Sequence, residues 1–214
     1  INPLVRLMEC YGLLGDYEKY EKTLKKAFEI VSPHKSQSPD MYALLLYYQA
    51  NLKVQQSDFT AASDYASQAI EIIEGNLDVH SVAYLNLAMT RVNCVKTEGF
   101  NDRAYELLIE AKKIADEMWP DTMTINKAII LGTMANYLID LGKGEEAQQY
   151  AEYIQAFFTT EKMKTTGAAI DAKEILAKTY FFNSAFNNAL TLEQEVIESR
   201  NSLLGDNNAG NIMS

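Results

Sequence analysis

The sequence predicts an all-α protein built from five copies of one helix–turn–helix unit. Apolar stripes of helical period fill the 214-residue chain, strand-type alternation is nearly absent, and only four prolines and ten glycines interrupt the stripes. A helix–glycine–helix stretch, clearest at 136–158, recurs along the chain. A recurring period of this length is typical of a helical repeat array.

The turn residues of the units set the period. They are Gly15, Ser57, Gly99, Gly142 and Ser184, which are 42, 42, 43 and 42 residues apart. Glycine and serine suit a turn backbone that a helix interior does not favour. The units are therefore expected at about 1–40, 41–80, 81–124, 125–166 and 167–214, as one array. Their first helices are expected near 2–14, 41–56, 81–97, 125–141 and 168–183, and the third turn, at 95–102, is expected to be irregular.

A small residue follows four of the turns by five positions, at Ala62, Ala104, Ala147 and Ala189. A small side chain lets two helix axes cross closely. Tyr20 takes this place in the first unit, so we expect its two helices to cross further apart. No unit can bury its apolar stripe alone, and stacking against neighbours makes a continuous core.

These aligned residues resemble the tetratricopeptide repeat (TPR). The first unit carries the resemblance best, through Leu4, Leu7, Met8, Tyr11, Gly15, Leu24 and Ala27. A common TPR has about 34 residues, and the longer unit here resembles the kinesin-light-chain-like subclass. Lys53 departs from the pattern, where an aromatic residue is expected. The resemblance implies an α-α superhelix whose first helices line a concave groove.

Composition excludes several classes of function. The net charge of -10 argues against a nucleic-acid surface and favours a neutral or basic protein or peptide ligand. No apolar run approaches the roughly 18 residues of a membrane span, so we expect no membrane partner. Two cysteines interpreted as reduced thiols favour the cytoplasm. The chain opens without Met and ends inside what resembles another unit, so we expect a fragment of a longer protein. Cys10 and Cys94 are expected to be buried thiols, with a disulfide as the alternative.

No catalytic, metal or cofactor site is predicted. His34 and His80 stand in loop-like segments, and no ligands converge on them at the spacing of a metal site or a triad. The stretch GKGEEA at 142–147 lacks the preceding strand and the Lys-Ser/Thr ending of a phosphate loop. The expectation is a protein that is not an enzyme and binds no cofactor.

The groove positions of the repeat give candidate binding residues. Position 9 of three consecutive units is Asn51, Asn93 and Asn136, and an amide offers both a donor and an acceptor to a peptide backbone. Apolar neighbours could then select side chains. The other candidates are Tyr47, Met89 and Gly132 at position 5, Asn86 with Leu44 and Ile129 at position 2, and Asp171, Glu174, Lys178 and Phe181 in the fifth unit. The alternative is that these asparagines are ordinary polar residues of an exposed face.

The sequence permits four functions, of which the fourth, an enzyme, is disfavoured. The first is a protein- or peptide-binding scaffold that uses the groove. The second is a regulatory or sensor module of a larger signalling or transcription-regulatory protein, because TPR arrays in bacterial regulators serve this purpose. The third is self-association through the ends of the array. The sequence does not identify the partner, because one fold serves many functions.

Overall fold

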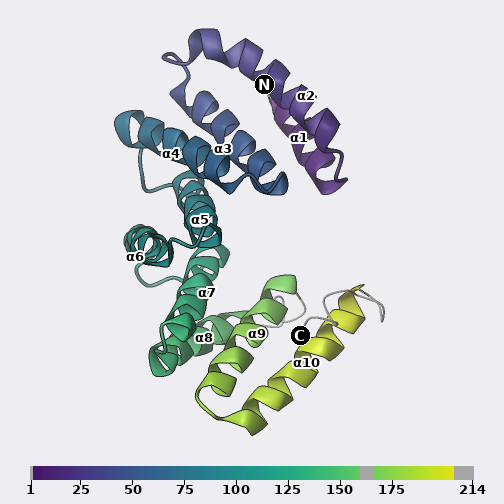
Figure 1. The fold of residues 1–214 in the computed structure, drawn as a ribbon, viewed down its shortest axis with the longest axis vertical. Helices are drawn as coiled ribbons and strands as arrows, with labels where there is room; N and C mark the ends of the chain where they lie inside the picture. Colours follow the sequence, from purple (N-terminus) through teal and green to yellow (C-terminus); the bar gives the residue numbers. More distant parts are fainter. Residues whose placement is uncertain (1, 160–165, 205–214) are drawn as a thin grey trace. The chain divides into compact units, whose positions relative to one another are not determined.

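The computed structural model describes residues 2–159 and 166–204, and within these ranges all regular secondary structure is helical. The prediction of an all-α fold of helix–turn–helix units is confirmed (Figure 1). The chain divides into two compact units, residues 1–120 and 121–214. The 43-residue step from Gly99 to Gly142 crosses the boundary between these units, so the repeat period is unbroken in sequence. That the five units form one array stays a prediction.

The first compact unit contains three helix pairs. They are α1 (Asn2–Leu13) with α2 (Tyr17–Val31), α3 (Pro39–Gln55) with α4 (Phe59–Asn76), and α5 (Val82–Thr97) with α6 (Asn101–Met118). A short 3-10 helix, η1 (Ser32–His34), follows α2. The second compact unit contains α7 (Ile125–Asp140) with α8 (Gly144–Phe158), and α9 (Gly167–Phe182) with α10 (Phe186–Leu204). The first helices thus begin and end within two residues of their predicted limits.

The five predicted turn residues are also those with a left-handed backbone. Their φ angles are 68° for Gly15, 59° for Ser57, 91° for Gly99, 76° for Gly142 and 63° for Ser184. In each turn this residue donates its N–H to the carbonyl three residues back, and the next residue donates to the carbonyl five residues back. This is the Schellman arrangement, which satisfies the last carbonyl groups of a helix.

The third turn follows this same pattern, so the expectation of an irregular turn at 95–102 is wrong. Gly99 donates to the carbonyl of Lys96 at 2.9 Å, and Phe100 donates to that of Val95 at 3.1 Å. The polar stretch Lys96–Glu98 still belongs to the helix and its C-cap. A single glycine at the left-handed position therefore ends α5 as the other turn residues end their helices.

Each core is built by a helix pair together with the first helix of the next pair. In the first compact unit, buried residues of α1, α2 and α3 form one cluster, and those of α3, α4 and α5 form another. In the second, α7, α8 and α9 share a cluster. The crossing residues Ala62, Ala104, Ala147 and Ala189 are at most 5% exposed, which agrees with their predicted role. One helix pair does not complete a core alone.

Tyr20 is buried at the crossing of α1 and α2, with 6% of its surface exposed. Gly12 faces its ring: a Cβ atom at Gly12 would lie 3.6 Å from Cε2 of Tyr20. The large side chain in α2 is therefore matched by a glycine in α1. A wider crossing of these two helices stays a prediction.

The two cysteines differ from the prediction in one respect. Both are free thiols, and Cys94 is buried, which raises its pKa to about 11. Cys10 is exposed, so the prediction that it is buried is wrong. Cys10 lies off the stripe of α1 that packs against the core through Leu4, Met8 and Tyr11.

Candidate functional site

Three cavities lie between consecutive first helices, on the side where the repeat pattern places its groove positions. Two are in the first compact unit, between α1 and α3 and between α3 and α5, with volumes of about 570 and 490 Å³. The third, about 190 Å³, lies between α7 and α9 in the second. Each is bordered on one side by residues of a second helix or of the turn beside it. Within each compact unit, the packing of consecutive first helices thus leaves a hollow between them.

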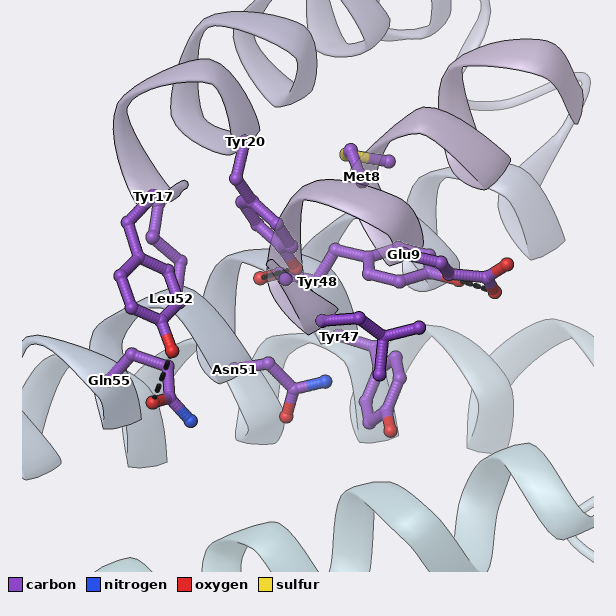
Figure 2. A pocket seen from close by; sticks show the side chains of 11 residues that line it. Met8, Glu9, Tyr17, Tyr20, Tyr47, Tyr48, Asn51, Leu52 and Gln55 are labelled. Atoms are coloured by element: carbon purple, nitrogen blue, oxygen red, sulfur yellow. Dashed lines mark hydrogen bonds between the residues drawn. The ribbon is translucent and has the colours of Figure 1, made fainter. Parts of the chain in front are cut away.

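The α1/α3 cavity is lined by four tyrosines, two amides and one carboxylate (Figure 2). Its buried wall is formed by Met8, Tyr20, Tyr48 and Leu52, which are at most 9% exposed. Its rim is formed by Glu9, Leu13, Tyr17 and Gln55, which are exposed. Tyr47 and Asn51 of α3 are half-buried between wall and rim. This combination gives a cavity with an apolar wall and a polar opening.

Three tyrosine hydroxyls in this cavity donate to groups of the protein itself. Tyr48 donates to Oε1 of Glu9 at 2.8 Å, and Tyr20 donates to the carbonyl of Tyr48 at 3.0 Å (Figure 2). Tyr17 donates to Oε1 of Gln55 at 2.9 Å. Burial raises the pKa of Tyr20 and of Tyr48, and for Tyr48 the bond to Glu9 adds to this effect, so both keep their protons at neutral pH.

The other two cavities contain the position-2 candidates. Leu44 and Asn86 line the α3/α5 cavity together with Tyr47, which also lines the α1/α3 cavity. Ile129 and Asp171 line the α7/α9 cavity. The three position-2 residues named from the sequence therefore lie on cavity walls within their own compact unit, as does Asp171 of the fifth unit.

The charged residues that line these cavities, among those the structure describes, are all acidic. They are Glu9 between α1 and α3, Asp40 and Asp78 between α3 and α5, and Asp171 between α7 and α9. Asp78 accepts hydrogen bonds from the backbone N–H and the imidazole of His80, and these hold the pKa of its carboxyl below the usual value. Such walls attract positive groups and repel carboxylates. They do not suit a clamp for a peptide carboxyl terminus.

The position-9 asparagines keep their side-chain amides free of hydrogen bonds to other described residues. Asn51 and Asn136 are half-buried on the walls of the α1/α3 and α7/α9 cavities, and Asn93 is exposed on α5. Asn183 shows the opposite case, because its amide donates to the Gly144 carbonyl and to the Gln148 side chain. Half-buried amides that have no partner within the fold are suited to pair with a ligand.

Position 5 differs from the expectation for two units. Met89 is buried, with 8% of its surface exposed, so it offers little area to a ligand. Gly132, at position 5 of the fourth unit, lies close to the next first helix: a Cβ atom there would lie 2.9 Å from Cδ1 of Ile175 in α9. Gly132 nevertheless lines the α7/α9 cavity. Tyr47, at position 5 of the second unit, lines two cavities.

Of the other candidates on α9, Glu174 is half-buried, whereas Lys178 and Phe181 are exposed. Lys178 forms a 2.6 Å ion pair with Glu174 one turn earlier, so its charge is already balanced. Phe181 is 67% exposed and packs edge-on against Phe186 of α10, with ring centroids 5.5 Å apart. The structure brings neither residue to the wall of the α7/α9 cavity.

Three residues of this site were not predicted from the sequence, and Glu9 is the first of them. It stands 42 residues before Asn51, so it holds position 9 of the first unit, and the period itself contained that signal. Tyr48 and Tyr17 were missed as well, because they lie outside the groove positions of the pattern. Their part in the cavity follows from the side-chain packing of α1, α2 and α3.

Comparison with known proteins identifies the fold. No family model matches the chain. The structure of BtubC (BKLC) from P. vanneervenii is similar, with a TM-score of 0.79, 16% identity and coverage of 94% of this chain and 80% of that one. A protein from Podosopora anserina with nearly identical TPR-like repeats of the kinesin light chain type gives a TM-score of 0.72, at 14% identity over 95% of this chain and 96% of the other.

Two further similarities are informative. YrrB, a TPR protein with an unusual peptide-binding site, gives a TM-score of 0.54 at 15% identity and covers 95% of this chain and 88% of that one. The Sol locus transcriptional repressor of Clostridium acetobutylicum is 30% identical over 122 residues, half of this chain. The match spans 36% of the length of that repressor. The chain therefore has the fold of TPR proteins, as its sequence predicts.

None of the described helices combines the length and the apolar character needed to cross a bilayer.

Proposed function

We propose that the chain is a protein-interaction module whose first helices bind extended peptide segments of neutral or basic character. The observation that carries this proposal is the set of free asparagine amides at position 9, two of them on cavity walls whose charged residues are all acidic. No catalytic role is proposed.

An extended peptide has alternating N–H and C=O groups that need partners when they leave water. An asparagine amide can donate to one and accept from the other, so it binds a backbone with little dependence on sequence. The cavities beside Asn51 and Asn136 then receive side chains, and their tyrosine, isoleucine and phenylalanine walls favour apolar contact. The description of YrrB as peptide-binding supports extending this function to the present chain.

The test begins with a displayed library of random eight-residue segments, from which wild-type protein selects binders. The best sequence is synthesised with an acetylated N-terminus and an amidated C-terminus, so that no terminal charge contributes. Its affinity is measured by titration calorimetry for the wild type and for the triple variant Asn51→Ala/Asn93→Ala/Asn136→Ala. Each lost hydrogen-bond pair costs about 1 kcal/mol, so we expect affinity to fall at least tenfold.

The matched control is Asn101→Ala/Asn187→Ala/Asn188→Ala, which removes three exposed asparagines from the second helices α6 and α10. This variant should bind as the wild type does. Both triple variants must give the circular dichroism spectrum and melting temperature of the wild type. The proposal is contradicted if no blocked peptide binds, or if the two triple variants lose equal affinity.

One observation favours a second candidate, a regulatory module in a longer protein. It is the 122-residue similarity to the Clostridium acetobutylicum transcriptional repressor. In this version the same surface binds a signal peptide, and binding alters the activity of another part of the protein. The test is DNA footprinting with the full-length protein encoded by the gene, carried out with and without the selected peptide. A peptide-dependent footprint supports the regulatory module. If the footprint does not change with the peptide, the function is that of a scaffold without this regulation.

A further inference from the structure

We propose that the α1/α3 cavity recognises a positively charged side chain of the bound peptide, with Glu9 as the counter-ion and the tyrosine rings as its walls. This inference rests on the proposed peptide-binding function and specifies the side chain that one of its cavities selects.

The charge of the cavity is the first argument. Glu9 is the one charged residue among the described residues that line it. Its Oε1 atom accepts the hydrogen bond from Tyr48, and Glu9 forms no ion pair with any described residue. Its Oε2 atom is therefore available at the rim. A carboxylate held in place by one bond and not engaged in an ion pair is a suitable partner for an ammonium or guanidinium group.

The direction of the hydrogen bonds is the second argument. The hydroxyl protons of Tyr17, Tyr20 and Tyr48 are all donated to groups of the protein. These hydroxyls can therefore offer only lone pairs to a ligand. A ligand group that donates several hydrogen bonds fits this arrangement, and a carboxylate or phosphate does not. The hydroxyl of Tyr47 and the amides of Asn51 and Gln55 supply the remaining donors and suit the peptide carbonyls beside the charged side chain.

The aromatic walls are the third argument. Tyr17, Tyr20, Tyr47 and Tyr48 all line the cavity, and Figure 2 shows these four side chains around one opening. The rings of Tyr20 and Tyr48 meet edge-on at 6.5 Å, and those of Tyr47 and Tyr48 are tilted at 5.6 Å. Cations are attracted to aromatic faces, and the aliphatic stem of lysine or arginine packs against the same surface. The volume, about 570 Å³, accommodates such a side chain with part of the adjoining peptide.

The remaining charged clusters of the described residues do not compete with this site for the same ligand. Asp171, on the wall of the α7/α9 cavity, is in a cavity of about 190 Å³ without a tyrosine wall. In the α3/α5 cavity, Asp78 is already paired with His80 at 3.1 Å, and Asp40 shares that cavity with one tyrosine, Tyr47. Only the α1/α3 cavity combines an unpaired carboxylate with several tyrosine rings in the described structure.

The test is a double-mutant cycle between the protein and a selected peptide. The library selection above is read for enrichment of lysine or arginine at one position. The blocked peptide is then made in its parent form and in a neutral form, with citrulline in place of arginine or acetyl-lysine in place of lysine. Citrulline removes the charge of a guanidinium group, and acetyl-lysine removes that of an ammonium group. The protein partners are wild type, Glu9→Gln, and the control Glu29→Gln, an exposed carboxylate of α2 outside the three cavities.

Glu9→Gln removes the charge but keeps an oxygen that accepts from Tyr48, so the cavity is preserved. We expect Glu9→Gln to weaken the parent peptide about tenfold, and the neutral peptide to bind the wild type about tenfold more weakly than its parent. In the Glu9→Gln background the two peptides should differ by less than threefold. Glu29→Gln should behave as wild type.

Two results would overturn the inference while leaving the proposed function intact. The selected peptides could depend on the position-9 asparagines yet show no preference for lysine or arginine. Alternatively, neutralising the peptide could cost the same in wild type and Glu9→Gln. If no blocked peptide binds the wild type, the proposed function and this inference fail together.

Discussion

Tyr48 donates a 2.8 Å hydrogen bond to Oε1 of Glu9, and this bond joins α3 to α1 at the opening of the α1/α3 cavity. Glu9 stands 42 residues before Asn51, at the same place in the preceding unit. The repeat period that builds the core therefore also places a carboxylate and an amide on the two sides of one cavity. Structure and proposed recognition depend on the same spacing.

Removing that bond should cost stability. Tyr48→Phe keeps the ring but loses the hydroxyl, and a hydrogen bond of this kind contributes about 0.5–1.5 kcal/mol to the free energy of unfolding. Tyr17→Phe, which loses an exposed bond to Gln55, should cost less than about 0.5 kcal/mol. Urea denaturation of both variants measures the difference. Equal stability of Tyr48→Phe and wild type would show that the bond does not join the helices.

The turn residues should respond to substitution according to their backbone. Gly142 and Ser57 both have positive φ, at 76° and 59°. A left-handed conformation costs a residue with a Cβ atom roughly 1–2 kcal/mol, so Gly142→Ala should destabilise by about 1 kcal/mol and Ser57→Gly should stabilise by up to about that amount. Ser67→Gly, inside helix α4, serves as the control and should destabilise by about 0.5–1 kcal/mol. Thermal or urea unfolding measures the stability of each variant. A destabilising effect of Ser57→Gly would contradict the assigned turn geometry.

Gly144 lies against the end of α9. A Cβ atom at Gly144 would overlap Oδ1 of Asn183 and would lie 2.6 Å from Cδ1 of Phe182. Gly144→Ala should displace Asn183, weaken its bonds to Gly144 and Gln148, and cost about 1–3 kcal/mol of stability. Gly75→Ala, in α4 with no atom within 4 Å of the added Cβ, should instead stabilise by about 0.5–1 kcal/mol. If both variants shifted the urea midpoint in the same direction, the proposed packing would be wrong.

His80 should make stability depend on pH. Its imidazole lies 3.0 Å from Oε2 of Glu117 and 3.1 Å from Oδ1 of Asp78, and these hydrogen bonds raise its pKa. A raised pKa in the folded state stabilises the protein below the unfolded value of about 6.5, and this stabilisation is lost as pH rises through the folded value. Asp78 has a lowered pKa, so its contribution is lost below about pH 4.

The combined effect should be greatest between about pH 4.5 and 6.5. The melting temperature of His80→Gln should fall below that of wild type at pH 5.5 and approach it at pH 8.5, with a smaller difference in high salt because the groups are exposed. If the difference in melting temperature between wild type and His80→Gln grew toward pH 8.5, the ion pairing of protonated His80 with Glu117 and Asp78 would be ruled out.

The fold was predictable from the sequence because its determinants are local and repeated. Gly15, Gly99 and Gly142 mark left-handed turns, and Ala62 or Ala147 marks a helix crossing, whatever the rest of the unit contains. The expected irregularity of the third turn was wrong because one glycine suffices to end α5. Cys10 was predicted to be buried because its helix is apolar, yet only one stripe of α1 packs against the core.

The candidate site was less predictable because it depends on contacts between helices. The period located Asn51, Asn136 and the position-2 residues on first helices, and they line cavities. Met89 shares the helix face of the position-5 candidates yet is buried, and one-dimensional spacing does not specify such burial. The orientation of Tyr48 toward Glu9 similarly joins residues 39 positions apart through packing of their side chains.

Side-chain amide NMR tests the central claim most directly. The NH2 signals of Asn51, Asn93 and Asn136 are assigned in ¹⁵N-labelled protein from single variants, and the selected blocked peptide is titrated in. These three signals should shift and saturate with the affinity measured by calorimetry, while those of Asn101, Asn187 and Asn188 on the second helices stay in place. Saturable binding that leaves the three position-9 signals unmoved would contradict peptide recognition by the first helices.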